Sequence, residues 1–336
     1  MQLSDFDYVL PPERIAQAPI EPRDAARLLV LDRATGDIAH RHVRDLPDLL
    51  RAGDLLVANR SRVLPARVFG ALRGGGRAEV LLLRRLGRAR WEALCRPARR
   101  LRLGDEVRIN DALTVTVDAV RPEGLRELVV RAEAGDPDAE LLAAGSTPLP
   151  PYIRGWSGDP ERYQTVFADT EGSAAAPTAG LHLTHDLLAR LEARGISFAT
   201  VVLHVGLDTF RPVTEADPRA HVIHREWCVV PPETCDRVAR TRSRGGRIVA
   251  VGTTVVRTLE TWATTGQTEG WTDLFILPGH RFVTTDALIT NFHLPQSSLL
   301  MLVSAFAGRD RVLNAYANAI RHEYRFYSFG DAMLIT

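Results

Sequence analysis

The stretch RIVAVGTT, residues 247–254, predicts the centre of the fold. Its apolar run is typical of a buried strand, and the following Gly252-Thr253-Thr254 opens a helix over residues 253–263. Ligands of open α/β sheets bind at the carboxyl ends of strands, where a helix N-terminus offers free N–H groups to a carboxylate or phosphate. We therefore predict that this glycine and the two threonines bind an anionic group of a ligand.

Arg257 and Glu260 follow on one face of the same helix. Two interpretations stay open: both side chains hold a charged ligand, or they form an i,i+3 ion pair with each other, which the spacing alone favours. The chain has neither a G-x-G-x-x-G nor a Walker sequence. A dinucleotide or nucleoside triphosphate site of those kinds is therefore not expected.

Strands and helices alternate outward from this stretch. Toward the C-terminus the pattern predicts a strand over 273–277 and helices over 297–306 and 310–324. Toward the N-terminus it predicts strands at 28–32, 38–43, 54–59, 196–203 and 221–230, and helices at 46–50, 185–194 and 232–244. This alternation predicts an α/β fold with a mixed or parallel sheet covered by helices.

Residues 61–150 have a different pattern from the rest of the chain. Short β-like runs lie at 62–72, 78–86, 90–96, 106–109, 113–120 and 127–132, separated by turns that contain glycine. Many short strands at close spacing predict a small antiparallel β-barrel. Because α/β segments flank the barrel on both sides, we predict that it is inserted into one α/β domain made of residues 1–60 and 151–336.

The composition is that of a globular protein. The chain has 336 residues, of which 45% are hydrophobic and 25% charged, which suits a core of two domains. It contains no apolar run of about eighteen residues, and its N-terminus lacks a basic, apolar signal pattern. Cys95, Cys228 and Cys235 are too few and too far apart for a disulfide framework or a cysteine zinc site. We expect a cytoplasmic protein with no membrane contact.

The positive charge is concentrated in one region. The chain contains no lysine, which codon usage in a GC-rich genome explains, so its basic residues are arginines. Residues 60–108 hold fourteen arginines against four acidic residues. Charge alone supports two interpretations equally: a surface that faces phosphate groups, or the solvated exterior of a barrel in a protein that uses only arginine.

Three loops at strand ends or before helices each carry one histidine, and these are His182, His204 and His293. The loop that ends at His182 also contains Thr178 and Gly180. A single histidine is more often structural than catalytic. Three histidines on equivalent loops favour a shared pocket.

The segment 221–226 has the spacing closest to a metal site. On a strand, His224 and Glu226 point to one face and His221 to the other, which separates the two histidines. The helical H-E-x-x-H pattern is absent. We therefore expect no metal site and interpret the segment as a polar strand in or near the pocket.

The segment 324–331 is rich in aromatic residues and includes Phe326 and Phe329. Aromatic faces stack a purine, and they attract a sulfonium through cation–π interaction. Packing of these rings into the core is the alternative, and composition alone favours it.

Together these segments resemble the S-adenosylmethionine:tRNA ribosyltransferase-isomerase family of the queuosine pathway. The resemblance extends from residue 5 to residue 333, and the order and spacing of its segments are specific. The matching segments are residues 5–8, 22–30, 40–42, 176–183, 203–210, 252–260, 274–279, 290–295 and 324–331. Asp208 stands where glycine is usual, and we expect its Cβ to reshape the pocket loop without abolishing activity.

The resemblance implies that S-adenosylmethionine is a co-substrate and that no metal takes part. The family transfers and isomerises the ribosyl part of S-adenosylmethionine, not its methyl group, onto 7-aminomethyl-7-deazaguanine at the tRNA wobble position. Epoxyqueuosine-tRNA forms, and adenine and methionine leave. The implied fold is an α/β domain with an inserted β-barrel, and the implied partner is the tRNA anticodon arm, which we expect a monomer to bind.

This reaction calls for proton transfer at several points. The sulfonium acidifies the ribose C5′ protons, adenine leaves more readily when protonated, and the attacking amine must be neutral. Histidine suits these roles near neutral pH. The catalytic candidates are therefore His182, His204 and His293, with His224 next and Glu226 as an orienting group.

The remaining candidates would bind the two substrates. For S-adenosylmethionine they are Gly252, Thr253, Thr254, Arg257, Thr178, Gly180, Phe326 and Phe329, where the helix N–H groups would hold the methionine carboxylate. For RNA they are Arg84, Arg85, Arg99 and Arg100, because arginine suits both the phosphates and the unstacked loop of an anticodon arm.

Two other classes of protein stay open. An S-adenosylmethionine-dependent RNA methyltransferase would show a glycine-rich loop after its first strand, and the sequence has none. A non-catalytic RNA-binding protein would not need the polar loops at 178–182, 204–209 and 291–293. The products separate the three classes: adenine, S-adenosylhomocysteine, or neither.

Overall fold

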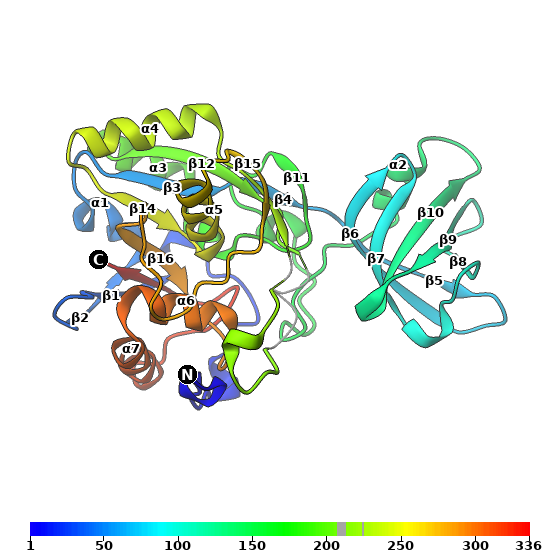
Figure 1. The fold of residues 1–336 in the computed structure, drawn as a ribbon, viewed down its shortest axis with the longest axis horizontal. Coiled ribbons are helices and arrows are strands. Elements are labelled where there is room, and N and C mark those ends of the chain that lie inside the picture. Colours follow the sequence, from blue (N-terminus) through cyan, green and yellow to red (C-terminus); the bar gives the residue numbers. More distant parts are fainter. Residues whose placement is uncertain (207–212, 224) are drawn as a thin grey trace. The chain divides into compact units, whose positions relative to one another are not determined.

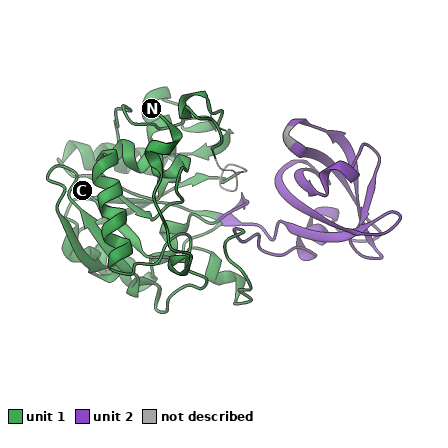
Figure 2. Cartoon of the chain, turned by 90° about the horizontal axis from the view of Figure 1, so that it is seen from below, with its two compact units in different colours: residues 1–61, 151–170, 176–336 green, residues 62–150, 171–175 purple. Residues whose placement is uncertain are grey.

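The computed structural model describes residues 1–206, 213–223 and 225–336 and divides the chain into two compact units (Figure 2). Unit 1 comprises residues 1–61, 151–170 and 176–336, and unit 2 comprises residues 62–150 and 171–175. The sequence-based division placed 171–175 in the α/β part. In the structure, strand β11 (Thr170–Ser173) instead pairs with β4 (Ser61–Val63) at the start of unit 2.

Unit 1 is built on one nine-stranded sheet. Its strands, in spatial order, are β15 (Glu269–Thr272), β13 (Glu226–Val229), β12 (Ser197–Leu203), β3 (Leu55–Asn59), β14 (Ile248–Val251), β16 (Ala287–Asn291), β17 (Ala332–Ile335), β1 (Arg27–Leu31) and β2 (Ile38–His42). The neighbours from β12 through β3 and β14 to β16 are parallel, whereas β13, β17 and β2 each run antiparallel to a neighbour. The sheet is therefore mixed, which confirms the predicted fold class.

Helices cover both faces of this sheet (Figure 1). They are α1 (Leu46–Leu49), α3 (His185–Ala193), α4 (Pro232–Ser243), α5 (Thr253–Thr265), α6 (Ser298–Ala307) and α7 (Arg309–Arg321). Because side chains alternate along a strand, Leu55 and Val57 of β3 face the core that includes α4 to α7. Leu56 and Ala58 face the other core, which includes α1 and α3.

Side-chain caps set the start of two of these helices. The Thr184 hydroxyl accepts a hydrogen bond from the N–H of Leu187 at 3.1 Å, and so begins α3. The Ser297 hydroxyl accepts one from the N–H of Leu300 at 3.2 Å, and so begins α6. These caps fix the helices that follow the loops carrying His182 and His293.

Unit 2 is a closed barrel with its own apolar core. Its strands, in spatial order, are β10 (Leu125–Ala132), β7 (Arg90–Arg96), β6 (Arg77–Gly87), β5 (Arg67–Leu72), β8 (Glu106–Arg108) and β9 (Leu113–Val120). Every described pairing in it is antiparallel, as predicted. The short helix α2 (Pro137–Ala143) packs against β10 and β9.

Two sequence-based element assignments need correction. The strand predicted at 273–277 is wrong: the strand is β15, which ends at Thr272, and the Leu274 carbonyl beyond it accepts a hydrogen bond from Arg257. The strand predicted at 221–230 is reduced to β13, because the chain before it enters a 3₁₀ turn over Pro218–Ala220. The side chains of Thr272 and Arg257 bond to the N–H and the carbonyl of Leu274, and the N–H of His221 donates to the carbonyl of Pro218.

Three further observations concern the cysteines, membrane-spanning helices and metal sites of the described residues. Cys95, Cys228 and Cys235 are free thiols. Within residues 1–206, 213–223 and 225–336, no helix has both the length and the apolarity to cross a membrane. In the same residues, no group of three or more histidine, cysteine, aspartate or glutamate side chains has the arrangement of a metal site.

Candidate functional site

The carboxyl ends of β12, β3, β14 and β16 meet at one edge of the sheet because these strands are parallel. A polar residue or a glycine lies at the end of each strand or directly after it. Asn59 ends β3, His204 follows β12, Gly252 follows β14 and Asn291 ends β16. The predicted site therefore has a physical basis in the strand order.

Asn59 joins three of these elements from a fully buried position. Its Nδ2 donates to the carbonyl of Leu203 at 3.0 Å and lies 3.4 Å from Oγ1 of Thr254. Its Oδ1 accepts from the N–H of Leu203 at 3.1 Å and from the N–H of Ser61 at 3.0 Å. The ends of β3 and β12 are thus fixed against the start of α5.

The N-terminus of α5 has no side-chain cap, so its first backbone N–H groups have no acceptor within the helix. Gly252 has a φ of 94°, which favours glycine, and its own N–H donates to the carbonyl of Ile289 at 2.7 Å. The N–H groups of Thr253 and Thr254 belong to the first helical turn, where the helix supplies no acceptor. A Cβ at Gly252 would lie 3.5 Å from that of Ala179, so the 178–182 turn packs directly against this helix start.

The 178–182 turn is tied to β16 and to the C-terminal segment. Oγ1 of Thr178 donates to Oδ1 of Asn291 at 3.0 Å, and Nδ2 of Asn291 donates to the carbonyl of Tyr327 at 3.0 Å. A Cβ on Gly180 would lie 3.0 Å from the Thr165 methyl group, so glycine permits close packing at this position. Thr178 therefore reaches the edge, whereas Gly180 supports the turn from behind.

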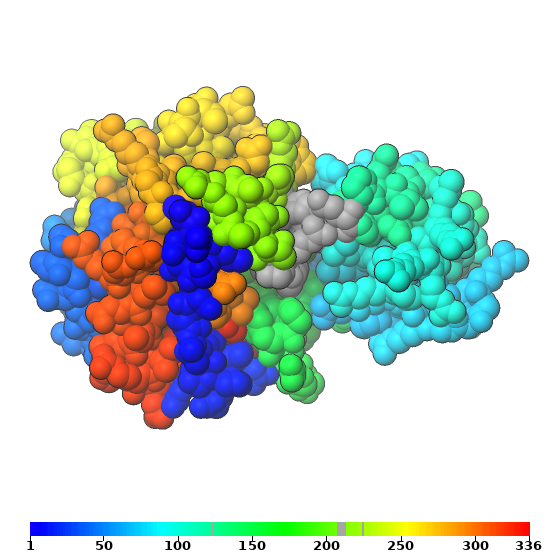
Figure 3. Space-filling model, turned by 60° about the horizontal axis from the view of Figure 1, so that its bottom comes forward, coloured from blue at the N-terminus to red at the C-terminus, as the bar shows by residue number. Residues whose placement is uncertain are grey.

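His293 is half-buried just beyond the end of β16. Its Nε2 contacts Oγ1 of Thr290 at 2.7 Å, and its backbone N–H donates to the Tyr316 hydroxyl at 2.9 Å. Its carbonyl accepts from the Tyr8 hydroxyl at 2.5 Å, and the N-terminal segment that carries Tyr8 lies along this face of unit 1 (Figure 3). Burial lowers the pKa of His293 to about 3, so its ring is neutral at physiological pH.

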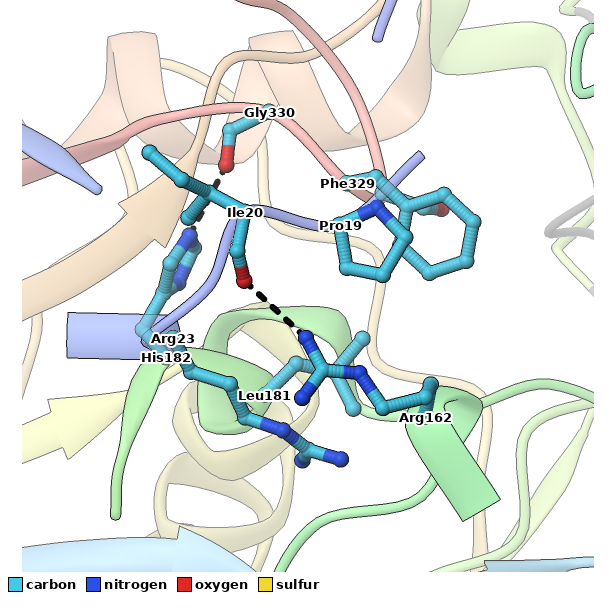
Figure 4. Close-up of a pocket in the computed structure, with 9 residues that line it drawn as sticks. Pro19, Ile20, Arg23, Arg162, Leu181, His182, Phe329 and Gly330 are labelled. Atoms are coloured by element: carbon cyan, nitrogen blue, oxygen red, sulfur yellow. Dashed lines mark hydrogen bonds between the residues drawn. The ribbon is translucent and has the colours of Figure 1, made fainter. Parts of the chain in front are cut away.

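His182 lies buried between two backbone carbonyls, and Figure 4 shows its contact with the carbonyl of Gly330. Its Nδ1 is 3.1 Å from the carbonyl of Ala179, and its Nε2 is 2.9 Å from the carbonyl of Gly330. Burial lowers its pKa, although both carbonyls act in the opposite direction. The adjoining pocket, which Phe329 also lines, has a volume of about 20 Å³, the space of a single water and not of a nucleoside.

His204 is half-buried directly after β12, and burial lowers its pKa. Its backbone N–H donates to the carbonyl of Trp227 at 3.0 Å. Its Nδ1 is buried and has no hydrogen-bond partner among the residues the structure describes. Of the three predicted histidines, His204 therefore offers an unused ring nitrogen at the edge, while both ring nitrogens of His182 are occupied.

Glu226 and Arg257 form a buried ion pair beside this edge. Nη1 of Arg257 donates to Oε2 of Glu226, and its Nε donates to the carbonyl of Leu274 at 3.0 Å. The other carboxylate oxygen of Glu226 accepts from the N–H of Gly206 at 2.8 Å, which fixes the chain after His204. Nη2 of Arg257 is buried and has no partner among the described residues, so it is available to an acceptor.

The i,i+3 pair of Arg257 with Glu260, which the spacing favoured, is therefore wrong. Glu260 is fully buried and accepts hydrogen bonds from the N–H groups of Val283, Thr284 and Thr285 at 2.7, 3.0 and 2.9 Å. The backbone of a distant loop satisfies the Glu260 carboxylate, which leaves Arg257 to Glu226. No spacing rule within one helix anticipates such partners.

The remaining sequence-based candidates lie elsewhere or outside the described residues. Phe326 has no exposed surface and packs in the core against Phe292, with 4.7 Å between the ring centroids. Phe329 is buried against Trp156 at 5.1 Å. His224 and Asp208 lie outside the described residues. The four candidate arginines are on the barrel: Arg84 pairs with Glu92, Arg85 with Asp138, and Arg99 and Arg100 are exposed.

Two residues of the edge were not among the predicted candidates. Asn59 and Asn291 are buried asparagines whose side chains join the strand ends. The sequence carries a signal for both, since the apolar strands LLVAN (Leu55–Asn59) and ALITN (Ala287–Asn291) end in the same residue. A polar amide that closes a buried strand needs hydrogen-bond partners, and a neighbouring strand end is where it finds them.

Comparisons with known proteins agree with one another. The profile of the family described as "Queuosine biosynthesis protein" matches residues 3–335. The S-adenosylmethionine:tRNA ribosyltransferase-isomerases of Moorella thermoacetica and Symbiobacterium thermophilum are 54% and 55% identical to the chain, each over 100% of both proteins. A crystal structure of S-adenosylmethionine tRNA ribosyltransferase from Thermotoga maritima matches with a TM-score of 0.58 and 42% identity, over 99% of this chain and 100% of that one.

Proposed function

This chain belongs to the queuosine biosynthesis protein family, and from that membership we infer that it is a transferase acting on tRNA with S-adenosylmethionine. It transfers and isomerises the ribosyl moiety of S-adenosylmethionine onto 7-aminomethyl-7-deazaguanine in the tRNA. Epoxyqueuosine-tRNA, adenine and methionine are the products. The match over the whole length of two such enzymes is the observation that carries this conclusion.

The N-terminus of α5 is the proposed site for the methionine carboxylate. The N–H groups of Thr253 and Thr254 and the positive end of the helix dipole suit an anion. Arg257 lies on the same helix: its Nη1 donates to Glu226, and its Nη2 has no partner among the described residues. A buried guanidinium nitrogen without an acceptor is costly unless a ligand supplies one, and a carboxylate does so.

We propose that the histidines at the carboxyl ends of the parallel strands transfer protons. Burial lowers the pKa of both His204 and His293, so both rings are neutral at physiological pH, but a pKa of about 3 makes His293 a weak base. We assign removal of the acidified ribose C5′ proton to His204, whose Nδ1 has no hydrogen-bond partner within the part of the chain that the structure describes, and place His293 beside the reacting groups. His182 becomes a positioning residue, because its two ring nitrogens lie 3.1 and 2.9 Å from backbone carbonyls and the neutral ring donates its single N–H to one of them.

The proposed role of unit 2 is to bind the tRNA. We propose that its arginine-rich barrel contacts the anticodon arm, that the protein works as a monomer, and that it does so in the cytoplasm. The excess of arginine over acidic residues in 60–108 supports this proposal, since RNA binding depends on neutralising phosphates.

Chromatography of the small-molecule products tests the proposed reaction. The protein is incubated with S-adenosylmethionine and an anticodon stem-loop that carries 7-aminomethyl-7-deazaguanine. We expect adenine and methionine in equal amounts, and neither with the same RNA carrying guanine. S-adenosylhomocysteine would indicate a methyltransferase. Binding of the RNA by folded protein without any product would indicate a non-catalytic RNA-binding protein.

A further inference from the structure

The two ends of the barrel differ in how their arginines are used. Glu79 of β6 pairs with Arg96 of β7, and Gly87 pairs with Arg90. The β5–β6 turn and the segment after β7 therefore share one end, and the β6–β7 turn lies at the other. Because Arg67 at the start of β5 bonds to Ser146, the chain enters and leaves near the second end. We name the first the distal end and the second the connection end.

Arg84 and Arg85 of β6 and Arg90 of β7, close to the β6–β7 turn, are paired with carboxylates, whereas Arg88 in the turn itself is exposed and has no ion pair among the described residues. Arg85 forms an ion pair with Asp138 of α2, and Arg84 lies 3.5 Å from Glu92. Arg90 pairs with Asp118. The Asp138 carboxylate also accepts from the indole of Trp91 at 2.6 Å, so it belongs to the barrel's own structure. Two of the four arginines predicted to bind RNA thus already have partners.

The distal end carries six exposed arginines, which we call the distal arginine cluster: Arg73, Arg77, Arg96, Arg99, Arg100 and Arg102. None of the six has an ion-pair partner among the described residues. Asp105 and Glu106 follow the cluster, and Asp105 is engaged by the N–H of Arg102 at 2.6 Å. Unpaired like charges at one end repel each other, which is unfavourable unless an anion neutralises them.

A buried arginine fixes the turn that carries Arg99 and Arg100. Arg126 is 6% exposed and donates to the carbonyls of Ala98 and Leu101, both at 2.7 Å. Leu101 is itself fully buried in the barrel core, so the turn that presents Arg99 and Arg100 is fixed from both sides. A turn whose backbone is already fixed loses less conformational entropy when it binds a ligand.

The two segments of the cluster lie next to each other. The Nη1 of Arg100 is 3.5 Å from the position that a Cβ on Gly76 would occupy. Gly76 belongs to the run 74–76, whose three φ values are positive and which has open space around its first two glycines. The β5–β6 turn therefore lets an extended, phosphate-bearing chain approach the arginines without steric hindrance.

The chemistry of this end suits phosphates and not bases. Phe69 is partly exposed, but Arg77 covers its ring at 4.0 Å, and Trp91 is buried. Base recognition in single strands relies on free aromatic faces, whereas recognition of an RNA helix relies on phosphates and shape. We propose that the distal arginine cluster binds the backbone phosphates of a helical stem of the tRNA substrate, a proposal that rests on the proposed function.

Two double variants with the same charge change test this proposal. Arg99→Glu with Arg100→Glu alters the distal arginine cluster. Arg88→Glu with Arg131→Glu alters two exposed arginines toward the connection end. The affinity for the modified tRNA is measured by fluorescence anisotropy across a series of salt concentrations, and adenine release is measured in parallel. A third variant, Arg99→Ala with Arg100→Ala, removes the positive charges without adding negative ones.

We expect the distal variants to weaken tRNA binding about tenfold or more and to reduce the salt slope by about one for each phosphate that the protein no longer neutralises. The connection-end variant should bind nearly as the wild type does. Equal losses of affinity in both double variants would mean a general charge effect and would overturn the proposal. Failure of the proposed function looks different: the wild-type protein would bind tRNA in the same salt-dependent way but release no adenine.

Discussion

His293 illustrates how burial sets the chemistry of single residues at this site. Its pKa falls from the ordinary 6.5 to about 3, and burial lowers the pKa of His182 and His204 as well. An unfolded chain takes up a proton near pH 6.5, but the native ring of His293 does not until about pH 3. The unfolded state binds more protons in that window, so stability is complete above it and falls as pH drops through it.

This linkage predicts how the free energy of unfolding depends on pH. The free energy of unfolding, measured by denaturant titration, should fall between pH 6.5 and about 4, and His293→Asn should make that fall shallower. His185→Gln, which changes an exposed histidine at the start of α3, should keep the wild-type slope. Identical slopes in wild type and His293→Asn would mean that the ring titrates normally in the native protein.

Two histidines should respond differently to truncation. His182→Ala removes a buried ring that joins Ala179 to Gly330, so we expect a loss of about 2–3 kcal/mol of unfolding free energy. His204→Ala should keep the wild-type stability within about 1 kcal/mol and lose turnover. Wild-type rates in His204→Ala would remove it as the base.

The sequence predicted the positions of these histidines but not their surroundings. Three histidines on strand-end loops indicated a shared pocket, and the structure places His204 and His293 at one edge of the sheet. It places His182 between two carbonyls that lie 148 and three residues away in the chain. Partners so distant in sequence depend on the whole fold, which spacing rules do not describe.

At the scale of elements, α5 is the most informative. The stretch at 247–254 predicted a buried strand followed by a helix, and β14 and α5 confirm both. The pattern was clear because β14 is buried on both faces and Gly252 needs a positive φ. The partner of Arg257 was predicted wrongly because Glu226 comes from β13, a strand whose predicted length was itself too great.

The Glu226–Arg257 pair should be strongly coupled. Glu226→Gln leaves the buried guanidinium uncompensated, so we expect a loss of about 3 kcal/mol or more of unfolding free energy. Adding Arg257→Met should restore most of that stability but not the KM for S-adenosylmethionine, because the proposed carboxylate ligand is then missing. Additive stability losses in the double variant would mean that the two side chains do not depend on each other.

The chain contains two units, and the sequence pattern of each unit predicts its own architecture. Alternating strands and helices indicated the α/β unit, and short glycine-punctuated strands indicated the barrel, because each pattern matches the period of its own architecture. The sequence did not predict which arginines at each end of the barrel are paired with carboxylates. The composition of residues 60–108 gives the number of arginines. Whether an arginine is paired depends on carboxylates such as Asp138 that lie far along the chain.

The fate of the ribose tests the proposed reaction most directly. S-adenosylmethionine is supplied with one label in the ribose and a different label in the methyl group, and the RNA carrying 7-aminomethyl-7-deazaguanine is isolated after reaction. We expect the ribose label in the RNA and the methyl label in free methionine. Methyl label in the RNA, or no label in RNA that the folded protein binds, would contradict ribosyl transfer by this chain.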